Sequence, residues 1–474
     1  MRQHFDLLVI GSGPAGHHAA IQGAKLGKSV ALVERPKCIG GVCLNTGTIP
    51  SKSLREAAIS LTGYRSRNQP DAPHRGGRRA MFPDLLSRCR SVIQKEVDVY
   101  RAQFARNGVE ILTGVAEFVD PGTVAIRHEG RSIEASADFI VIACGTEPAK
   151  SKQFPVDGRR IFDADGVYGL ECVPKTLIVV GGGVIGLEYA SIFALLGSHV
   201  TLLDGRARLL EFVDGEIVEA LAYHLRDAGV TLRLGETVAR VEADANGVTA
   251  ITESNKLLRA EAVLYAAGRQ GATADLNLAA AGLEADSRGR LEVDERYRTA
   301  VPHILAAGDV IGFPSLASTS MEQGRSAVAG AFGAQGMPSL GAFPYGIYTI
   351  PEISFVGQTE EQLTAAAIPY EVGIARYREI ARGNIVGDES GRLKLAFHRE
   401  TEALLGVHIV GEGATELVHI GQAVMSLGGT ARYFVDQVFN YPTFAECYKV
   451  AALHGLNKLA QCPVPAAERK KRAA

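Results

Sequence analysis

The sequence of 474 residues lacks the features of a membrane protein, of a nucleic-acid-binding protein and of a secreted disulfide-rich protein. No stretch approaches the roughly 18 consecutive apolar residues that a spanning helix requires. Neither sign of charge dominates, because 50 Lys and Arg stand against 52 Asp and Glu, so we expect neither a nucleic-acid nor a membrane partner. The seven cysteines are odd in number and form no C-x-x-C pair, which excludes a disulfide framework and a cysteine zinc site.

Other absences narrow the prediction further. An apolar strand begins at Phe5 and leaves no room for a leader peptide, so we expect a soluble, cytoplasmic protein. His17 and His18 have no carboxylate or thiol at ligand spacing, and we expect no metal. The basic segment 65–79 is rich in Arg, Pro and Gly, which is typical of an exposed loop and not of a nucleic-acid-binding arm. The length predicts about three domains.

What the sequence does contain is an internal repeat, because residues 5–34 recur in outline at residues 176–204. Each copy reads as an apolar strand, a G-x-G-x-x-G turn, an alanine-containing helix and a second apolar strand. The first glycine makes a tight turn, the second lets the backbone approach a pyrophosphate, and the third allows close helix–strand packing. These glycines are Gly11, Gly13 and Gly16 in the first copy and Gly181, Gly183 and Gly186 in the second.

An acidic residue closes each copy at the same distance from the first glycine. Glu34 follows Gly11 by 34 − 11 = 23 residues, and Asp204 follows Gly181 by 204 − 181 = 23 residues. A carboxylate at this place accepts hydrogen bonds from an adenosine ribose, while the phosphates lie at the helix N-terminus. Two dinucleotide sites in one chain are most simply assigned to FAD and to a nicotinamide dinucleotide.

Further glycines mark where other segments return to these sites. Gly308 and Asp309 end an apolar strand, and Asp309 is a candidate hydrogen-bond partner for a ribityl hydroxyl of FAD. Gly145 and Gly268 end the apolar runs that start at 139 and 263, and we expect both at the dinucleotide sites. Gly41 belongs to the motif GGVCLNTGTIPSK at residues 40–52, which we also place beside the flavin.

Together these motifs resemble the FAD-dependent pyridine nucleotide–disulfide oxidoreductase superfamily over nearly the whole chain, from Phe5 to about Leu459. The resemblance implies two Rossmann-like α/β domains, for FAD and NAD(P), and an α+β C-terminal dimerisation domain, with a homodimer as the assembly. With the repeat, it places the FAD domain at 1–150, the NAD(P) domain at 151–275, a segment completing the FAD site at 276–344 and the interface domain at 345–474.

The disulfide chemistry of that superfamily is incomplete here. The motif at 40–52 holds Cys43, but Thr48 stands where the superfamily has a second cysteine. In the C-terminal stretch NYPTFAE, Tyr441 replaces a histidine base, while Glu446 is retained. A tyrosine with a pKa near 10 is a poor base at neutral pH, and dithiol exchange needs two sulfurs. We therefore expect no reduction of a disulfide substrate by the usual route.

The motifs at 47–55, 346–354, 368–373 and 440–446 instead resemble the soluble (si-specific) NAD(P) transhydrogenase branch. This resemblance implies hydride exchange between NAD(H) and NADP(H) through FAD, in a ping-pong cycle without a redox-active disulfide. Two alternatives stay open: an NAD(P)H dehydrogenase that reduces quinones or other small acceptors, and a flavin-loaded redox sensor that uses Cys43. The physiological direction and the preference between NAD and NADP stay open as well.

The resemblance also implies roles for individual residues. Lys52 and Glu188 would form an ion pair beside the flavin and the nicotinamide, the alternative being two unrelated surface charges. Tyr441 and Glu446 of one chain would approach the flavin of the other. Cys43 is open to three interpretations: a small apolar filler against the flavin, a thiolate that donates charge to it, or a redox sensor.

The second dinucleotide site offers mixed signals about the nicotinamide. Asp204 favours NAD, because a carboxylate repels the 2′-phosphate of NADP. Arg206 and Arg208 follow at once, and an arginine can give paired hydrogen bonds to that phosphate while Asp204 turns aside or pairs with it. The alternative for Arg206 is a solvated charge at the end of a strand.

Overall fold

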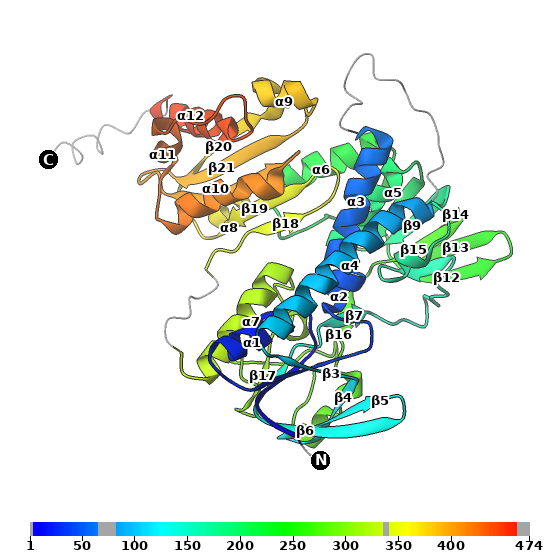
Figure 1. Cartoon of the computed structure of the whole chain (residues 1–474). Helices are drawn as coiled ribbons and strands as arrows, with labels where there is room; N and C mark the ends of the chain where they lie inside the picture. Colours follow the sequence, from blue (N-terminus) through cyan, green and yellow to red (C-terminus); the bar gives the residue numbers. More distant parts are fainter. Residues whose placement is uncertain (1–2, 65–81, 335–340, 462–474) are drawn as a thin grey trace. The chain divides into compact units, whose positions relative to one another are not determined.

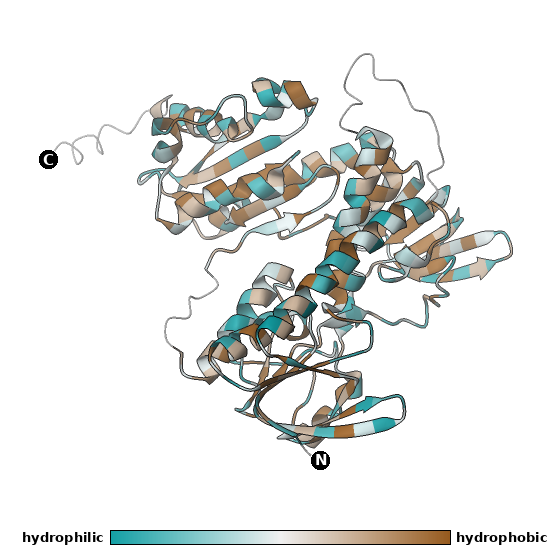
Figure 2. Cartoon of the chain, viewed as in Figure 1, coloured by the Kyte–Doolittle hydropathy of each residue, from teal (hydrophilic) through white to brown (hydrophobic). Residues whose placement is uncertain are grey.

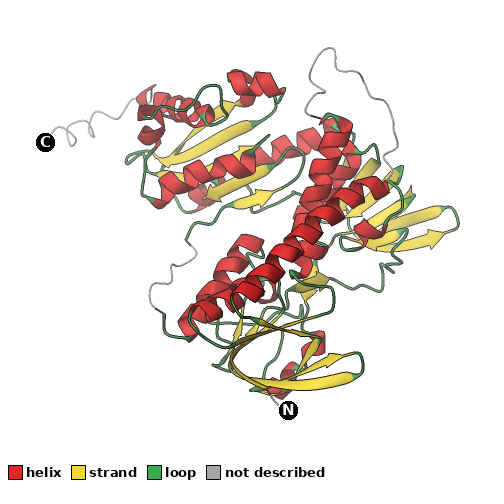
Figure 3. Ribbon diagram, in the orientation of Figure 1, coloured by secondary structure: helices red, strands yellow, loops and turns green. Residues whose placement is uncertain are grey.

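A computed structural model describes residues 3–64, 82–334 and 341–461 of the chain (Figure 1). The basic segment 65–79, expected to be an exposed loop, lies outside the described residues. The chain divides into two compact units, each assembled from stretches far apart in sequence. The described part of the first unit comprises 3–57, 82–181, 237–334 and 341, and that of the second comprises 58–64, 182–236 and 342–461. Helices and strands occur in both (Figure 3).

The first unit is built on a sheet in the order β3-β2-β1-β6-β5-β4, with β17 also paired to β6. β1, β2, β3, β6 and β17 run parallel, whereas β4, β5 and the start of β6 form an antiparallel meander. The strands are β1 (Gln3–Ile10), β2 (Val30–Glu34), β3 (Glu110–Thr113), β4 (Val115–Asp120), β5 (Thr123–His128), β6 (Arg131–Ile142) and β17 (Ile304–Ala306).

Both faces of the parallel part of this sheet are buried, as expected for parallel strands covered by helices. Along β1, Leu8 and Ile10 belong to one apolar core, and Leu7 and Val9 belong to another on the opposite face, because successive side chains alternate across a strand. Figure 2 shows hydrophilic and hydrophobic residues interleaved along the helices of the chain. The helices of this part are α1 (Pro14–Lys25), α2 (Gly41–Asn45), α3 (Thr48–Thr62, which continues into the second unit), α4 (Phe82–Arg106) and α7 (Ala317–Ala331).

Helix α1 packs directly on α7, and the two lie side by side in Figure 1. A glycine makes this close approach possible, because a Cβ atom at Gly324 of α7 would overlap the carbonyl oxygen of Ala15 in α1. The packing fixes the start of α1, where the first glycine-rich turn ends.

The first unit also holds a parallel set, β8-β15-β9, and two small antiparallel sheets, β12-β13-β14 and β7-β16. The strands are β7 (Thr146–Pro148), β8 (Ile161–Asp163), β9 (Thr176–Val180), β12 (Val238–Asp244), β13 (Gly247–Thr252), β14 (Leu257–Ala260), β15 (Ala262–Tyr265) and β16 (Arg269–Gly271). The repeat predicted β9 as the counterpart of β1, and the strand ends at Val180, next to the second glycine-rich turn.

The second unit contains a helix–strand segment and a C-terminal domain. The segment comprises α5 (Val184–Leu195), β10 (His199–Asp204), α6 (Gly215–Asp227) and β11 (Thr231–Leu234), with β10 and β11 parallel. The C-terminal domain has an antiparallel sheet in the order β18-β19-β22-β21-β20, whose strands are β18 (Tyr345–Ile347), β19 (Ile353–Gly357), β20 (Tyr370–Arg376), β21 (Arg392–His398) and β22 (Leu404–Val410).

The helices of that domain are α8 (Glu360–Ala365), α9 (Ala381–Val386), α10 (Ala414–Ser426), α11 (Ala431–Asp436) and α12 (Glu446–Gln461). The domain has its own core, in which Tyr377, Phe434 and Tyr448 are fully buried. The observed elements agree with the predicted fold class of two dinucleotide-binding domains and an α+β C-terminal domain. The boundaries at 150, 275 and 344 stay predictions. Over the described ranges, no helix has the length and apolar character to cross a membrane.

Candidate dinucleotide sites

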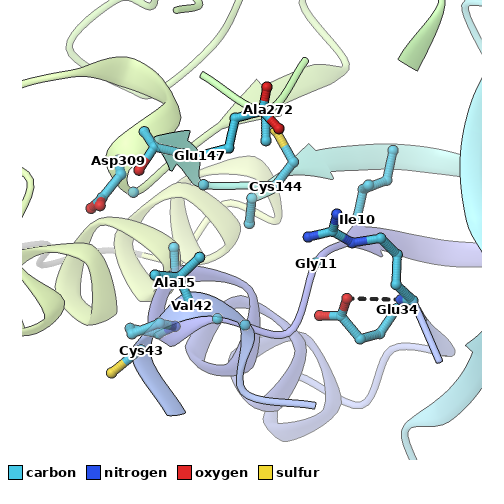
Figure 4. Close-up of a pocket in the computed structure, with 18 of the residues that line it drawn as sticks. Ile10, Gly11, Ala15, Glu34, Val42, Cys43, Cys144, Glu147, Ala272 and Asp309 are labelled. Carbon is cyan, nitrogen blue, oxygen red and sulfur yellow. Dashed lines mark hydrogen bonds between the residues drawn. The ribbon is translucent and has the colours of Figure 1, made fainter. Parts of the chain in front are cut away.

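A long cleft opens along the carboxyl ends of the parallel strands in the first unit (Figure 4). Its empty volume, including the part open to solvent, is about 1330 Å³. Eight residues predicted at the flavin site line it: Gly11, Gly13, Glu34, Gly41, Cys43, Gly145, Gly308 and Asp309. All of them come from one unit, so the first unit by itself brings these predicted flavin residues together.

The glycine-rich turn at the start of α1 has the geometry that a phosphate site requires. Gly11 adopts φ +98°, and a Cβ atom there would lie 2.5 Å from the carbonyl oxygen of Ala143. A Cβ at Gly16 would overlap the carbonyl oxygen of Gly11. At Gly13 a Cβ would meet no protein atom within 4 Å, so this glycine leaves open space before the N-terminus of α1. An anion such as a pyrophosphate is stabilised at this place by free N–H groups and by the helix dipole.

Glu34 closes the other side of the same turn. Its Oε2 atom accepts hydrogen bonds from the backbone N–H of Ser12 at 2.7 Å and from the Ser12 hydroxyl at 2.6 Å. The Ser12 hydroxyl in turn accepts from the N–H of Gly40 at 2.8 Å, which ties the 40–52 motif to the turn. The carboxylate is thereby fixed beside the cleft, as expected for a group that receives a ribose diol.

Asp309 and Cys43 lie at one end of the cleft, and Glu34 lies at the other end (Figure 4). Burial raises the pKa of Asp309, and the nearby charge of Arg269 and hydrogen bonds with Ser320 and Thr146 offset this only in part. The residues therefore suit an extended dinucleotide such as FAD, with phosphate space at Gly13, an adenosine acceptor at Glu34 and a polar group at Asp309.

Sequence reasoning missed several residues of this cleft. Ser12 occupies a variable position of the G-x-G-x-x-G motif, and its bridging role follows only from the fold. Arg35 and Cys144 also line the cleft, as do the segments 114–116 and 274–276. None of these carries a recognisable motif, because strand ends and turns acquire ligand contacts through topology. Arg35 follows Glu34 directly and Cys144 directly precedes Gly145, so their proximity to predicted residues could have indicated both.

Cys43 lines the cleft as a thiol in a protein-covered environment. Burial raises the pKa of Cys43, and a hydrogen bond with Thr48 lowers it only in part. The thiol therefore stays protonated around neutral pH, which agrees with an apolar filler and disagrees with a charge-donating thiolate. Thr48 offers a hydroxyl at the place of the second sulfur and has no redox chemistry of its own.

Alkylation tests this assignment of Cys43. In the native protein near neutral pH, Cys43 should react with iodoacetamide at least about tenfold more slowly than an exposed cysteine, because only the thiolate is nucleophilic. Mass spectrometry after timed quenching measures the rate, and Cys172, which is exposed, is the internal reference. Equal labelling of Cys43 and Cys172 would contradict a protonated, protected thiol.

His17 is a packing residue of α1. Its ring stacks on Tyr100 with 4.0 Å between ring centroids, and burial lowers the pKa of His17 to about 4. It is therefore neutral at physiological pH. Across the described residues, no group of three or more His, Cys, Asp or Glu side chains is arranged to hold a metal ion.

The second acidic residue is held differently from the first. Asp204 accepts a hydrogen bond from the N–H of Gly182 at 2.6 Å, which is the counterpart of the Ser12 bond to Glu34. Arg206 also forks onto it, with Nε 2.9 Å from Oδ1 and Nη2 2.7 Å from Oδ2. Burial raises the pKa of Asp204, but the hydrogen bonds from Arg206 and Gly182 outweigh burial and leave that pKa lowered. Arg206 is thus paired in the described structure, one of the two arrangements that the sequence left open.

Gly183 and Gly186 lie at the start of α5, as predicted. Gly183 precedes the helix, and a Cβ atom there would meet no protein atom within 4 Å. Gly186 is buried in the first turn of α5. Gly181 has φ +107° and Gly268 has φ +145°, conformations that favour glycine. Their contacts with a nicotinamide dinucleotide stay predictions.

Glu188 is buried on the same helix and is fixed by the C-terminal domain. Its Oε1 accepts a hydrogen bond from the backbone N–H of Tyr348 at 2.9 Å. One turn further, the Ser191 hydroxyl accepts from the N–H of Ile350 at 3.2 Å. Lys52 belongs to the first unit, where its Nζ lies 3.3 Å from the Ser51 hydroxyl. Its ion pair with Glu188 stays a prediction.

Tyr441 and Glu446 lie on either side of the turn that precedes α12. The Tyr441 side chain is exposed. Glu446 begins α12, and its Oε2 is buried without a hydrogen-bond partner among the residues that the structure describes. The approach of both residues to a flavin in a second chain stays a prediction.

Fold and site together define a flavoprotein class with two dinucleotide-binding repeats and a separate C-terminal domain. Comparison with family models gives the same result. Residues 5–324 match the model described as pyridine nucleotide-disulphide oxidoreductase, and residues 343–452 match its dimerisation domain. The chain belongs to the pyridine nucleotide-disulphide oxidoreductase family, whose members use FAD and act on pyridine nucleotides.

Three curated relatives with high identity over nearly the full length carry the same name. The soluble pyridine nucleotide transhydrogenase of Mycobacterium tuberculosis is 53% identical over 461 residues, which cover 96% of this chain and 98% of the relative. The protein of the same name from Colwellia psychrerythraea is 47% identical over 463 residues, covering 96% and 98%. That of Vibrio cholerae is 46% identical, covering 97% and 99%.

Solved structures show the same architecture at lower identity. The HOCl-induced flavoprotein disulfide reductase RclA of Escherichia coli superposes with a TM-score of 0.85 at 29% identity, covering 94% of this chain and 99% of the other. LpdA of Mycobacterium tuberculosis superposes with a TM-score of 0.86 at 26% identity, covering 95% and 99%. The fold is therefore shared with disulfide reductases, whereas the full-length relatives with the higher identities are transhydrogenases.

Proposed function

We propose that this protein transfers hydride between NAD(H) and NADP(H) through bound FAD, in a ping-pong cycle that uses no redox-active disulfide. The observation that carries the proposal is the cleft itself, where the half-buried Cys43 is hydrogen-bonded to Thr48, which stands at the place of the second cysteine of the motif. Transhydrogenase relatives at 46–53% identity over nearly the full length support the same reaction.

Bound FAD supplies a two-electron carrier that takes a hydride from one nicotinamide and returns it to another. The chain's own residues hold and orient the two dinucleotides. Gly13 and the N-terminus of α1 receive the FAD pyrophosphate, Glu34 receives its adenosine ribose, and Asp309 bonds the ribityl chain. The turn at Gly183 and the start of α5 receive the pyrophosphate of NAD(H) or NADP(H).

Lys52 and Glu188 form the ion pair beside the flavin in this proposal. A fixed cation there stabilises the negative charge that develops on the ring system during hydride transfer. The bond from the Tyr348 N–H to Glu188 holds the carboxylate in one place, so the pair does not have to reorganise as each nicotinamide enters.

The sulfur-based alternatives receive less support. A redox sensor needs an accessible, low-pKa thiol, whereas burial raises the pKa of Cys43. We further propose that the protein acts as a cytoplasmic homodimer, which the match to the dimerisation domain at 343–452 supports. In that dimer, Tyr441 and Glu446 approach the flavin of the partner chain.

Anaerobic stopped-flow reduction tests the function directly. NADH and NADPH, supplied separately, should each bleach the flavin absorbance of the purified protein, and the oxidised form of the other nucleotide should restore it. Initial-rate plots at several fixed concentrations of the second nucleotide should give parallel lines, the signature of a ping-pong cycle. Failure of NADPH to reduce the flavin would overturn transhydrogenation and favour an NADH-dependent quinone reductase. Turnover of lipoamide would overturn the absence of disulfide chemistry.

A further inference from the structure

The loop between β10 and α6 contacts both the second dinucleotide turn and the C-terminal domain. This loop, residues 205–214, begins directly after Asp204 and carries Arg206 and Arg208. In its middle, Leu209 is buried and lies against the dinucleotide turn, because a Cβ atom at Gly182 would be 2.7 Å from Leu209 Cδ2. Arg206 is held beside the end of β10, because its N–H donates to Asp204 Oδ1 at 2.8 Å and its carbonyl oxygen accepts from the N–H of Gly235 at 2.9 Å. The position of the rest of the loop therefore determines where Arg208 stands relative to the turn.

The far end of the loop is fixed by a buried ion cluster. Asp214 ends the loop and caps α6, where its Oδ1 accepts from the N–H of Glu216 at 3.2 Å. The same Oδ1 lies 2.8 Å from Nζ of Lys394, and both side chains are 1% exposed. Nζ also contacts Glu360 of α8 and lies 3.3 Å from Oε2 of Glu216. One cation in β21 thus holds three carboxylates from the loop end, α6 and α8.

The charge state of the cluster is set by these contacts. Burial lowers the pKa of Lys394, but hydrogen bonds to Asp214 and Glu360 outweigh burial, so the ammonium is charged near neutral pH. His408 also faces the cluster, and burial lowers its pKa and keeps it neutral. If one charged partner of such a buried set is removed, the remaining charges stay buried without compensation. This destabilises the fold more than replacing the whole set with apolar residues would.

Two further contacts hold the loop to the same domain. Nη2 of Arg208 donates to Glu361 of α8 at 2.9 Å and to the carbonyl oxygen of Val213 at 3.2 Å. The ring of Phe212 lies 5.1 Å from that of Tyr345 in β18, measured between centroids. These anchors of the loop beyond Leu209 lie in the C-terminal domain or in the cap of α6.

We propose that Lys394 is a positioning residue for the 2′-phosphate of NADP(H), acting through the 205–214 loop on Arg208, which stands beside the locally fixed Arg206. This inference rests on the proposed function and assigns its coenzyme discrimination to a buried residue of the C-terminal domain. Asp204 itself is held by Gly182 N–H and lies at the end of β10, so the ribose contact of NAD(H) does not depend on the anchor. Only a ligand with a 2′-phosphate needs both arginines in place.

Two variants of the full-length, FAD-loaded protein test the proposal. Lys394→Met removes the cation and keeps an unbranched side chain, and Asp214→Asn removes one charge and keeps a good helix N-cap. Isothermal titration with adenosine 2′,5′-bisphosphate and with 5′-AMP measures binding with and without the 2′-phosphate. We expect affinity for the bisphosphate to fall about tenfold in Lys394→Met, within the range for residues that act through a loop, and affinity for 5′-AMP to stay within about twofold.

Leu395→Ala is the matched control. Leu395 is the next residue of β21, is fully buried and points to the opposite face of the sheet, so its truncation weakens the domain without touching the cluster. It should lower the melting temperature and leave the ratio of the two affinities unchanged, whereas Lys394→Arg should retain most of the wild-type ratio.

The outcomes separate this inference from the proposed function. If Lys394→Met and Asp214→Asn weaken both ligands equally, or if Leu395→Ala shifts the ratio as much, Lys394 is a structural residue only and the inference is wrong. If wild-type protein does not bind adenosine 2′,5′-bisphosphate more tightly than 5′-AMP, the inference is likewise wrong. The proposed function fails separately, if NADPH does not reduce the wild-type flavin.

Discussion

Gly16→Ala protein is expected to be purified without most of its flavin. The added methyl group would overlap the carbonyl oxygen of Gly11 and stand 3.3 Å from Cβ of Ala143, so α1 must shift away from the turn that receives the pyrophosphate. Forced overpacking of this kind costs about 1–3 kcal/mol of stability. If FAD binding must restore the strained turn and bears the whole cost, FAD affinity falls roughly 5- to 150-fold. The ratio of visible flavin absorbance to protein absorbance after gel filtration measures the loss.

Gly13→Ala separates ligand approach from protein packing. No protein atom lies within 4 Å of the added methyl group, so the apoprotein should melt at the wild-type temperature, whereas FAD should bind more weakly because the methyl group occupies the phosphate space. If Gly13→Ala bound FAD as tightly as wild type, the pyrophosphate would lie elsewhere. Full flavin content in Gly16→Ala would contradict the tight contact between α1 and the turn.

Arg206→Gln is expected to raise the KM for NADPH much more than the KM for NADH. In the described structure Arg206 covers both oxygens of Asp204, and in the proposed cycle it turns to the 2′-phosphate of NADP(H). The variant loses a charge-assisted interaction of about 1.5–3 kcal/mol and exposes an unpaired carboxylate to that phosphate. The KM for NADPH should therefore rise by roughly 10- to 150-fold, while the KM for NADH stays within about threefold because its ribose carries no phosphate.

A control for Arg206→Gln is an arginine–aspartate pair that lies elsewhere in the chain. Arg259 pairs with Asp244 at 2.7 Å between β14 and β12, away from both glycine-rich turns in sequence, so Arg259→Gln should change neither KM. Steady-state assays with thionicotinamide acceptors measure both values. An equal rise of the two KM values in Arg206→Gln would show that the side chain supports the site as a whole and does not read the 2′-phosphate.

The local parts of the fold were predictable from the sequence. The two copies of strand, glycine turn, helix and strand contain their own signals, because apolar periodicity and positive-φ glycines act over a few residues. β1, α1 and β2 follow one another as predicted, and Glu34 and Gly13 meet in one cleft. The resemblance to a family added the C-terminal domain, which has no dinucleotide motif of its own.

Contacts between distant stretches could not be predicted in the same way. The Tyr348 N–H that fixes Glu188 is 160 residues away in sequence, and the Lys394 ammonium is 180 residues from Asp214. No motif marks either pair, since a backbone N–H has no sequence signature and a buried lysine looks like any other lysine. Ser12 was missed for a different reason: its hydroxyl matters only because the chain brings Gly40 back to the turn.

All eight predicted residues of the flavin cleft belong to one unit, whereas the pair that we propose to distinguish the coenzymes, Asp204 and Arg206, belongs to the other. Substitutions that change the preferred nicotinamide dinucleotide therefore need not weaken FAD binding. Substitutions along residues 204–214, in evolution or by design, can therefore change the preference between NAD(H) and NADP(H) while the protein keeps its bound FAD.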